Sequence, residues 1–419
     1  FIALIASYLN APSFIESMKF LGLMGLAFAT YWVVKAFVAD EKTFRRMVVL
    51  LLLVGVGEAL FGIMAWSLIP FGLNLGVQFY AFGPNSGYDI SCRNFTYSPY
   101  GTQFESNIFG SYTLGITLVL MTLLLSSAGR TRGRLVLAGI VVGIVAVALS
   151  LTRGALAGFA VGAFAILAFA EGKWSDRLKV TAVAAVVLAV AVVVSTELPE
   201  RLVRSPESTV AFELSQECAQ VVRPQPFLTG TTPRGPGALG AGETPRLTPT
   251  PPRATPTPGP DSTPAAQTPG GFMTLERLLT SESVSYRLDS WVRAVNDWLD
   301  HPWLGNGANA FAQRYITTSR TRDWIDNVEL MALHDTGLIG LAILLFWFVA
   351  GTIDLVRAIR HSPPSYTRTM LLGLALSFIG LLVAYQVTTA FWLGFTWVHL
   401  GLMRAGTLIL QRHDDTSAS

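Results

Sequence analysis

The chain alternates long apolar stretches with short polar ones, and this pattern sets the fold class. About 20 predominantly apolar residues are needed to cross the hydrocarbon core of a bilayer. The pattern predicts nine membrane spans, near Ser13–Val38, Met47–Ile69, Asn107–Ala128, Leu135–Thr152, Ala155–Ala170, Val180–Val194, Leu330–Thr352, Met370–Thr388 and Phe391–Leu410. Residues Phe1–Leu9 resemble the end of a further span, in a sequence that starts without Met. We therefore expect an all-α polytopic membrane protein with about 9–10 transmembrane helices and a truncated N-terminus.

The composition agrees with this prediction, and the basic residues give an orientation. Hydrophobic residues make up 51% of the chain and charged residues 14%, whereas a soluble protein carries about 25% charged residues. Lys and Arg accumulate in the short cytoplasmic loops of membrane proteins. In this chain the basic residues of four short loops fall on one side: Lys35, Lys42, Arg45 and Arg46; Arg130, Arg132 and Arg134; Lys173, Arg177 and Lys179; and Arg357, Arg360 and Arg368. We take that side as cytoplasmic.

The predicted spans divide the chain into three parts. Residues 1–196 form an N-terminal transmembrane bundle with an outer loop at 70–106. Residues 197–329 form a large periplasmic or extracellular loop, and residues 330–419 form the last helices and a cytoplasmic tail. Within the large loop, residues 224–271 are rich in Pro, Thr and Gly and have no apolar periodicity. This composition predicts a disordered or extended insert.

Two further features belong to the outer loops. Apolar residues recur at helical spacing between Leu275 and Leu299. They predict one or two amphipathic helices that either rest on the outer membrane surface or cap the bundle. The two cysteines, Cys92 and Cys218, both fall in predicted outer loops, where oxidation is allowed. A disulfide between these loops and two unpaired thiols are the alternatives.

Two arginines on the outer side are candidates for binding an anion. Arg153 lies in Ser150-Leu-Thr-Arg-Gly-Ala155, between the end of one span and the start of the next. A charge near a span is costly and usually has a partner, and the guanidinium fork suits phosphate or carboxylate oxygens. Arg287 lies on the predicted amphipathic helix. The alternatives are that Arg153 snorkels from the helix end and that Arg287 is a solvated surface residue.

An acidic cluster comes just before the seventh predicted span. Asp323, Asp326 and Glu329 are spaced three residues apart. Asp326 is either a general base for an acceptor hydroxyl or a helix N-cap, because Asp followed three residues later by Glu resembles a capping box. A divalent metal held by these carboxylates is a third alternative. His334 lies eight residues after Asp326, inside the span, where it is either catalytic or hydrogen-bonded between helices.

Other polar and small residues near the spans carry weaker signals. Glu58 lies within an apolar span and needs a partner such as Lys19 or an arginine. Asn107 begins a span. Gly337 and Gly340 are predicted to let neighbouring helices approach closely.

Four stretches, taken in order, resemble the O-antigen ligase and O-antigen polymerase (Wzy-type) superfamily of membrane glycosyltransferases. They are Glu105-Ser-Asn-Ile-Phe-Gly110, similar to an Asn-rich turn before a span; Ser150-Leu-Thr-Arg-Gly-Ala155, similar to an Arg-Gly motif; Arg287, Trp291 and His301-Pro-Trp-Leu-Gly-Asn-Gly307, similar to the end of the large outer loop; and Asn327 with Gly337 and Gly340, similar to a His-Asn…Gly-x-x-Gly signature. The resemblance covers most of the chain. It departs from the family's ligases at Asp326, which stands where they have His, and this favours a polymerase or another branch.

The resemblance implies an inverting glycosyltransferase that uses an undecaprenyl-pyrophosphate-linked oligosaccharide at the outer leaflet. Arg153 and Arg287 would clamp the pyrophosphate. Asp326 or His334 would orient or deprotonate the hydroxyl of a glycan or lipid acceptor. Further site candidates are Asn107, Asn327 and Glu329.

The resemblance also implies a location and a set of partners. We expect a multi-pass protein of the bacterial inner membrane that takes part in cell-envelope polysaccharide or lipopolysaccharide assembly. Its partners would be the donor, the acceptor and membrane lipids, with no nucleic acid, no metal and no other cofactor. Ligase and polymerase both stay open.

Two other functions compete with this one. A transporter or flippase for polysaccharide or lipid-linked substrates is the main alternative, although the sequence shows no internal repeat of the kind that transporters carry. A protein that displays the Pro/Thr-rich loop is another. An enzyme requires Arg153, Arg287 and Asp326 to converge on one outward-facing cavity, whereas the other two functions predict that they scatter.

Overall fold

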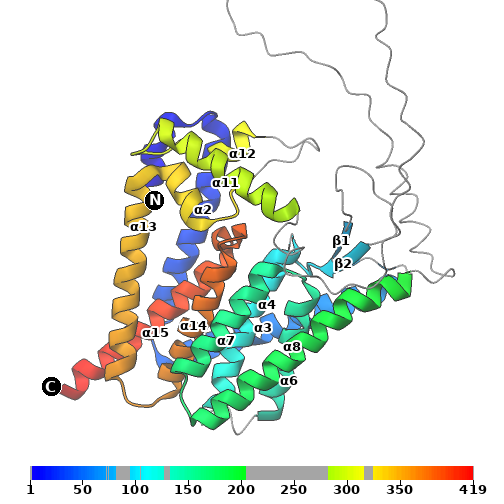
Figure 1. The fold of residues 1–419 in the computed structure, drawn as a ribbon. Helices are drawn as coiled ribbons and strands as arrows, with labels where there is room; N and C mark the ends of the chain where they lie inside the picture. The colour runs from blue at the N-terminus through cyan, green and yellow to red at the C-terminus, as the bar shows by residue number, and fades with distance from the viewer. Residues whose placement is uncertain are drawn as a thin grey trace, which may run out of the picture.

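The structure is a computed structural model that describes residues 2–71, 73, 75–81, 95–103, 105–126, 133–203, 282–315 and 324–418. Nine long helices make up most of it (Figure 1): α2 (Phe14–Phe37), α3 (Glu41–Leu68), α4 (Ser106–Leu125), α6 (Gly133–Leu149), α7 (Arg153–Phe169), α8 (Trp174–Val203), α13 (Val328–His361), α14 (Tyr366–Ala384) and α15 (Gly394–Ala418). The other elements are α1 (Ile2–Ala6), η1 (Ser7–Asn10), η2 (Ile69–Phe71), β1 (Val77–Ala81), β2 (Phe95–Pro99), α11 (Glu282–Asp300), α12 (Ala310–Arg314) and η3 (Thr389–Trp392).

The structure confirms the all-α polytopic fold, because each predicted span coincides with one of the nine helices. Six of them, α2, α3, α4, α8, α13 and α14, are long and apolar enough to cross a membrane. The apolar helices α6 and α7 are shorter, at 17 residues each. The predicted tail of a further span is instead α1 followed by the 3-10 helix η1. Strands β1 and β2 form an antiparallel pair in the outer loop that follows α3.

Some sequence predictions lie outside the described residues. These are both cysteines, the insert 224–271 and Asp323.

Helix α14 lies at the centre of the bundle, between α4 and α7. At the crossing of α7 and α14 a side chain on Gly158 would collide with the backbone carbonyl of Gly380. The two backbones therefore touch directly, as small residues allow between membrane helices. This packing makes α4, α7 and α14 one block, which we call the floor.

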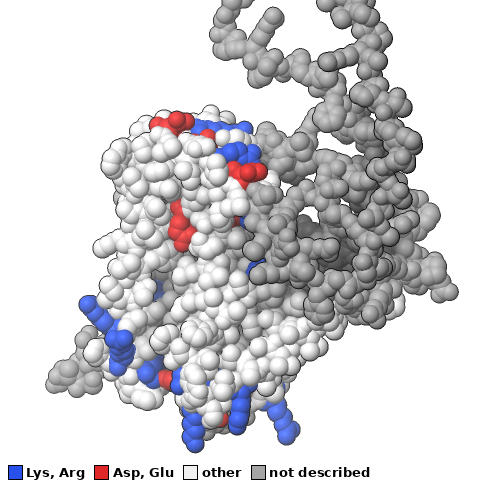
Figure 2. Space-filling view, in the orientation of Figure 1, with Lys and Arg blue, Asp and Glu red and all other residues white. Residues whose placement is uncertain are grey.

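Most of the described basic residues gather at one end of the bundle, at the bottom of Figure 2, while a few lie beside acidic residues at the other end. They flank the helix ends there, on the loops α2–α3, α7–α8 and α13–α14 and at the start of α6. At the same end Arg368 of α14 pairs with Glu171. The distribution follows the positive-inside pattern expected of a multi-pass membrane protein.

The opposite end is covered by a cap made of α1, η1, α11 and α12, which lies above α2 and α13 in Figure 1. Helix α11 packs against α13, so the amphipathic segment caps the bundle. Its apolar residues divide between two faces: Trp291 and Ala294 point inward, whereas an exposed stripe points outward. The stripe consists of Leu288, Val292, Val295 and Leu299.

The loop between α11 and α12 is joined to a kink in α13. At the kink Gly337 has φ 66° and ψ −168°, which no helix allows. The following N–H groups, of Leu338 and Ile339, donate to the carbonyls of Pro302 and Trp303 at 2.9 and 3.3 Å. The loop thus supplies acceptors that the interrupted helix lacks.

Hydrogen bonds are also donated from the loop to α13. The N–H groups of Asn306 and Gly307 donate to the carbonyls of His334 and Asp335 at 2.8 and 3.2 Å. At Gly305, which has φ 74°, a side chain would overlap the backbone of Asp335. Gly305 and Gly337 therefore allow the loop between α11 and α12 to pack directly against the kinked part of α13. The prediction that Gly337 brings two helices together was wrong, because its close neighbours are Trp303 and Leu304 of this loop.

The partner of Glu58 also differs from the prediction. Its carboxylate accepts hydrogen bonds from the N–H and the hydroxyl of Thr102, at 2.7 and 2.9 Å. Lys19 instead pairs with Glu16 on its own helix, at 2.8 Å. Glu58 therefore anchors the loop that leads into α4.

Candidate active site

Two of the predicted site residues, Arg287 and Asp326, form an ion pair. Arg287 Nε lies 3.5 Å from Asp326 Oδ2, and the two side chains are 25% and 23% exposed. Arg287 Nη2 also donates to the carbonyl of Val387, at 3.5 Å, just after α14. The pair therefore joins the cap helix α11, the segment before α13 and the outer end of the floor.

Arg153 comes to the same place from the floor. It is the first residue of α7, is half-buried, and lies close enough to Arg287 for the two positive charges to repel each other. The next residue, Gly154, contacts Val387 and Ala384 at the end of α14. Arg153 and Arg287, from separate parts of the chain, therefore lie within electrostatic range of each other on either side of Val387.

A tight corner between α6 and α7 positions Arg153. Leu151 in this corner has φ 51°, a left-handed conformation that is uncommon for a non-glycine residue. Thr152 Oγ1 donates to the carbonyl of Ser106 at 3.2 Å, which ties the corner to the start of α4. Asn107 stands beside this tie, and its side-chain oxygen accepts from the N–H of Ile108 at 2.9 Å.

Three helices begin next to these residues. Helix α4 begins at Ser106, α7 at Arg153 and α13 at Val328. The positive ends of their dipoles add to the two guanidinium groups. These positive groups lie beside the carboxylates of Asp326 and Glu329, the first of which pairs with Arg287.

The start of α13 corrects one prediction. Asn327, and not Asp326, is the N-cap, because its side-chain oxygen accepts from the N–H of Leu330 at 2.8 Å. The helix begins one residue later than a capping box from Asp326 to Glu329 requires. Asp326 therefore lies outside the helix, and its carboxylate faces Arg287.

Gln386 connects two further site candidates, Asn327 and Glu329, to the end of α14. The sequence analysis did not identify Gln386. Its side-chain oxygen accepts from Asn327 Nδ2 at 2.9 Å, and its Nε2 donates to both carboxylate oxygens of Glu329, at 3.2 and 3.0 Å. A glutamine at the outer end of an otherwise apolar span was the available signal. It holds the first turn of α13 against the end of α14.

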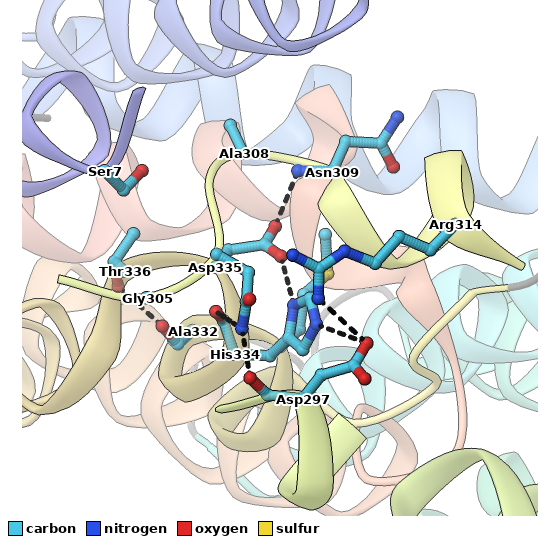
Figure 3. Close-up of polar contacts among 12 residues, drawn as sticks. Ser7, Asp297, Gly305, Ala308, Asn309, Arg314, Ala332, His334, Asp335 and Thr336 are labelled. Atoms are coloured by element: carbon cyan, nitrogen blue, oxygen red, sulfur yellow. Dashed lines mark hydrogen bonds and ion pairs between the residues drawn. The ribbon is translucent and has the colours of Figure 1, made fainter. Parts of the chain in front are cut away.

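His334 lies in a separate polar cluster under the cap (Figure 3). Its side chain is fully buried, with Nδ1 2.8 Å from Asp335 Oδ1 and Nε2 3.6 Å from Asp297 Oδ2. The other oxygen of Asp335 accepts from the N–H of Asn309 at 2.8 Å. Arg314 lies 3.3 Å from Asp297. One imidazole thus stands between two carboxylates from different helices.

Tyr315 completes this cluster. Its hydroxyl donates to Asp297 Oδ1 at 2.9 Å. Burial, together with the neighbouring Asp297, raises the pKa of the Tyr315 phenol, so the hydroxyl keeps the proton that it donates. The cluster links α11, α12 and α13, and it gives His334 no open side toward Arg153 or Arg287.

Residues 138–345 match the family model described as O-Antigen ligase. The chain thus carries an O-antigen ligase superfamily domain over just under half of its length. The matched segment of this superfamily member contains Arg153, Arg287, Asp326 and His334. No curated protein matches the chain.

Membership in the O-antigen ligase superfamily makes the chain an O-antigen ligase-like membrane glycosyltransferase, a group that acts on lipid-linked glycans. Among the described residues no group of three or more His, Cys, Asp or Glu side chains is placed to hold a metal ion. Asp323, one of the three carboxylates considered for such a site, lies outside them.

The large cavity of this superfamily member is not at the arginines. It has a volume of about 550 Å³ and lies between α2, α13 and α15. Neither Arg153, Arg287 nor Asp326 lines it. The expectation that the three residues share one cavity does not hold for this cavity; Arg287 and Asp326 form an ion pair elsewhere, with Arg153 within electrostatic range of Arg287.

Proposed function

We propose that the chain transfers or polymerises a glycan from a polyprenyl-pyrophosphate-linked donor at the outer leaflet. The observation that carries this proposal is the ion pair between Arg287 and Asp326, with Arg153 within electrostatic range of Arg287. Such an arrangement suits a diphosphate anion next to a carboxylate. The end with few basic loops then faces the outside of a bacterial inner membrane, and the large loop lies there.

The two arginines hold the leaving group in this proposal. Each guanidinium presents a fork of N–H donors that matches phosphate oxygens. With Arg153 on the floor and Arg287 on the cap, the pyrophosphate lies between them and neutralises their mutual repulsion. The clamp also stabilises the charge that develops on the pyrophosphate as the sugar leaves.

Asp326 acts on the acceptor. The acceptor oxygen attacks the anomeric carbon from the face opposite the pyrophosphate, and the bond from that carbon to the pyrophosphate oxygen breaks with inversion. The electron pair leaves with the polyprenyl pyrophosphate, and the hydroxyl proton passes to the Asp326 carboxylate. Because Asp326 is paired with Arg287, an incoming pyrophosphate competes for that guanidinium and frees the carboxylate for the acceptor.

We assign the base role to Asp326 and not to His334. Asp326 is partly exposed beside the arginines, whereas His334 is fully buried and held by Asp335. A general base must come within hydrogen-bond reach of the proton that it takes. His334 is a positioning residue that keeps the cap on α13.

The deciding experiment incubates the purified protein with a polyprenyl-pyrophosphate-linked oligosaccharide, with and without an added acceptor. Products are separated by size and by attachment to the carrier. A ladder that stays on the polyprenyl carrier identifies a polymerase, and glycan on the acceptor identifies a ligase. Absence of both, with an Asp326→Ala variant behaving like the wild type, would move a transporter ahead of the enzyme.

A further inference from the structure

The cavity of about 550 Å³ between α2, α13 and α15 is not used by the proposed reaction. Helix α15 packs against both α2 and α13, so it forms the back of a slot whose sides are the other two helices. The volume falls in the range of about 300–1,000 Å³ that is usual for small-molecule sites. The slot also meets the surface, since its lining residues Trp32 and Ile343 are 48% and 51% exposed.

The walls of the slot are apolar along most of its length. The rings of Trp347 and Trp397 stack with centroids 6.2 Å apart, and Tyr31 meets Trp347 edge-on at 5.7 Å. Tyr31 and Trp347 lie on α2 and α13, two of the helices that are long and apolar enough to cross a membrane. A hydrocarbon chain fits such walls, whereas a polar ligand would leave its hydrogen-bonding groups unsatisfied.

The end of the slot near the basic end of the protein carries positive charge. Lys35 lies 4.0 Å from the ring centroid of Trp32, and Arg404 pairs with Asp354 at 2.7 Å. All three charged residues line the cavity. Two cations and one carboxylate leave net positive charge there. The charged residue at the other end, Asp335, is an acid engaged by His334.

We propose that this slot binds one anionic glycerophospholipid, with the phosphate beside Lys35 and Arg404 and an acyl chain along the Trp347–Trp397 wall. Basic pockets between transmembrane helices on the cytoplasmic side are known to take anionic lipid headgroups, and the cytoplasmic leaflet supplies such lipids. The acidic outer end does not suit a phosphate. The lipid therefore lies in the leaflet opposite the Arg153–Arg287 site, and the proposal does not depend on the glycosyl-transfer proposal.

The structure offers a matched pair of variants to test the chain position. Gly351 lines the slot, and a Cβ atom at this position would meet no atom within 4 Å. Gly351→Leu is therefore expected to occupy part of the slot. Gly57 on α3 is also a helical glycine with open space around it, and it does not line the slot, so Gly57→Leu is the control.

The test is native mass spectrometry of the purified full chain titrated with phosphatidylglycerol or phosphatidylcholine that carry the same acyl chains. Wild type is expected to bind one phosphatidylglycerol in preference to phosphatidylcholine. Lys35→Gln should weaken phosphatidylglycerol binding roughly fivefold and leave phosphatidylcholine unchanged. Gly351→Leu should lose both, and Gly57→Leu should behave as wild type. Melting curves of all variants show that each is folded.

Three results would overturn the proposal. Equal binding of the two lipids with no effect of Lys35→Gln would remove the headgroup site. Unchanged binding by Gly351→Leu would place the lipid elsewhere on the surface. Displacement of phosphatidylglycerol by a lower concentration of polyprenyl phosphate would assign the slot to the carrier lipid instead.

Discussion

Arg287 of the cap and Asp326 before α13 lie 3.5 Å apart, while Arg287 also reaches the end of α14. Arg287 therefore links the cap helix α11 to the Asp326 carboxylate and to the backbone that follows α14. Replacing it by Lys keeps the charge and removes the fork. We expect Arg287→Lys to lower glycosyl transfer by roughly 100-fold or more, with an unchanged melting temperature.

The control for this variant lies on the same helix. Arg293 contacts Ser290 and the ring of Tyr315 and lies away from Val387, so Arg293→Lys should retain most of the transfer activity. Transfer is measured with the carrier-linked donor. Wild-type activity in Arg287→Lys would exclude a bidentate clamp at this position.

Asp326 is predicted to act in the chemical step and not in donor binding. Asp326→Asn should lower kcat by roughly 100- to 10,000-fold, the usual contribution of a general base. Because the change also removes the carboxylate that holds Arg287, the donor should bind at least as tightly as in wild type. Steady-state kinetics and direct donor binding are both needed, and weaker donor binding with normal kcat would contradict the assignment.

Asn327 caps α13 and also bonds to Gln386, and two substitutions can separate these two interactions. Asn327→Ala loses both the N-cap and the hydrogen bond to Gln386, and should cost about 1 kcal/mol of stability from the cap alone. Asn327→Ser keeps a capping oxygen but is too short for Gln386. We expect Ser to restore the melting temperature while transfer stays reduced. Full recovery of transfer by Ser would show that the link to Gln386 does not position the site.

His334 is predicted to hold the cap. His334→Gln removes the group between Asp335 and Asp297, and leaving a buried polar group without its partner costs about 1–3 kcal/mol. The expected result is a lower melting temperature and faster proteolysis between α11 and α13. His361→Gln, at the exposed basic end of α13, is the control. A stable His334→Gln protein without transfer activity would instead make His334 catalytic.

Gly337 should tolerate no side chain. Its backbone is left-handed, and a Cβ atom would overlap the carbonyl group of Trp303. The backbone conformation alone costs an L-residue about 1–2 kcal/mol. Gly337→Ala is therefore expected to lower the melting temperature, whereas Gly351→Ala in the same helix, where space is open, should leave it unchanged or raise it. Equal melting temperatures for the two variants would contradict the kink.

The helices of this fold could be predicted from sequence because each is defined by its own apolar run. The limits of α2 and α14 differ little from the predicted spans near Ser13–Val38 and Met370–Thr388. Burial in a bilayer acts on each segment separately, so no long-range information is needed. The same reasoning predicted that Arg153 and Arg287 lie at the same end of the bundle, and in the structure they lie within electrostatic range of each other.

The features that were missed depend on contacts between distant segments. The kink at Gly337 exists because residues 302–307 supply hydrogen bonds to it, and no local pattern specifies which loop does so. Gln386 acquires a role only when α14 ends beside Asn327. The N-cap of α13 is Asn327, one residue later than the capping-box pattern predicts, and Asp326 pairs with Arg287 instead. In each case tertiary contacts overrode a plausible local pattern.

One arginine of the anion site belongs to the floor and the other to the cap. A chain cut between Val203 and Glu282 would therefore leave Arg153 on one fragment and Arg287 on the other, each with half of the binding groups. Neither fragment can hold a diphosphate with two guanidinium forks. In the proposed reaction the donor therefore binds only when the two halves are assembled. A protein whose cap is displaced loses donor binding, and with it glycosyl transfer.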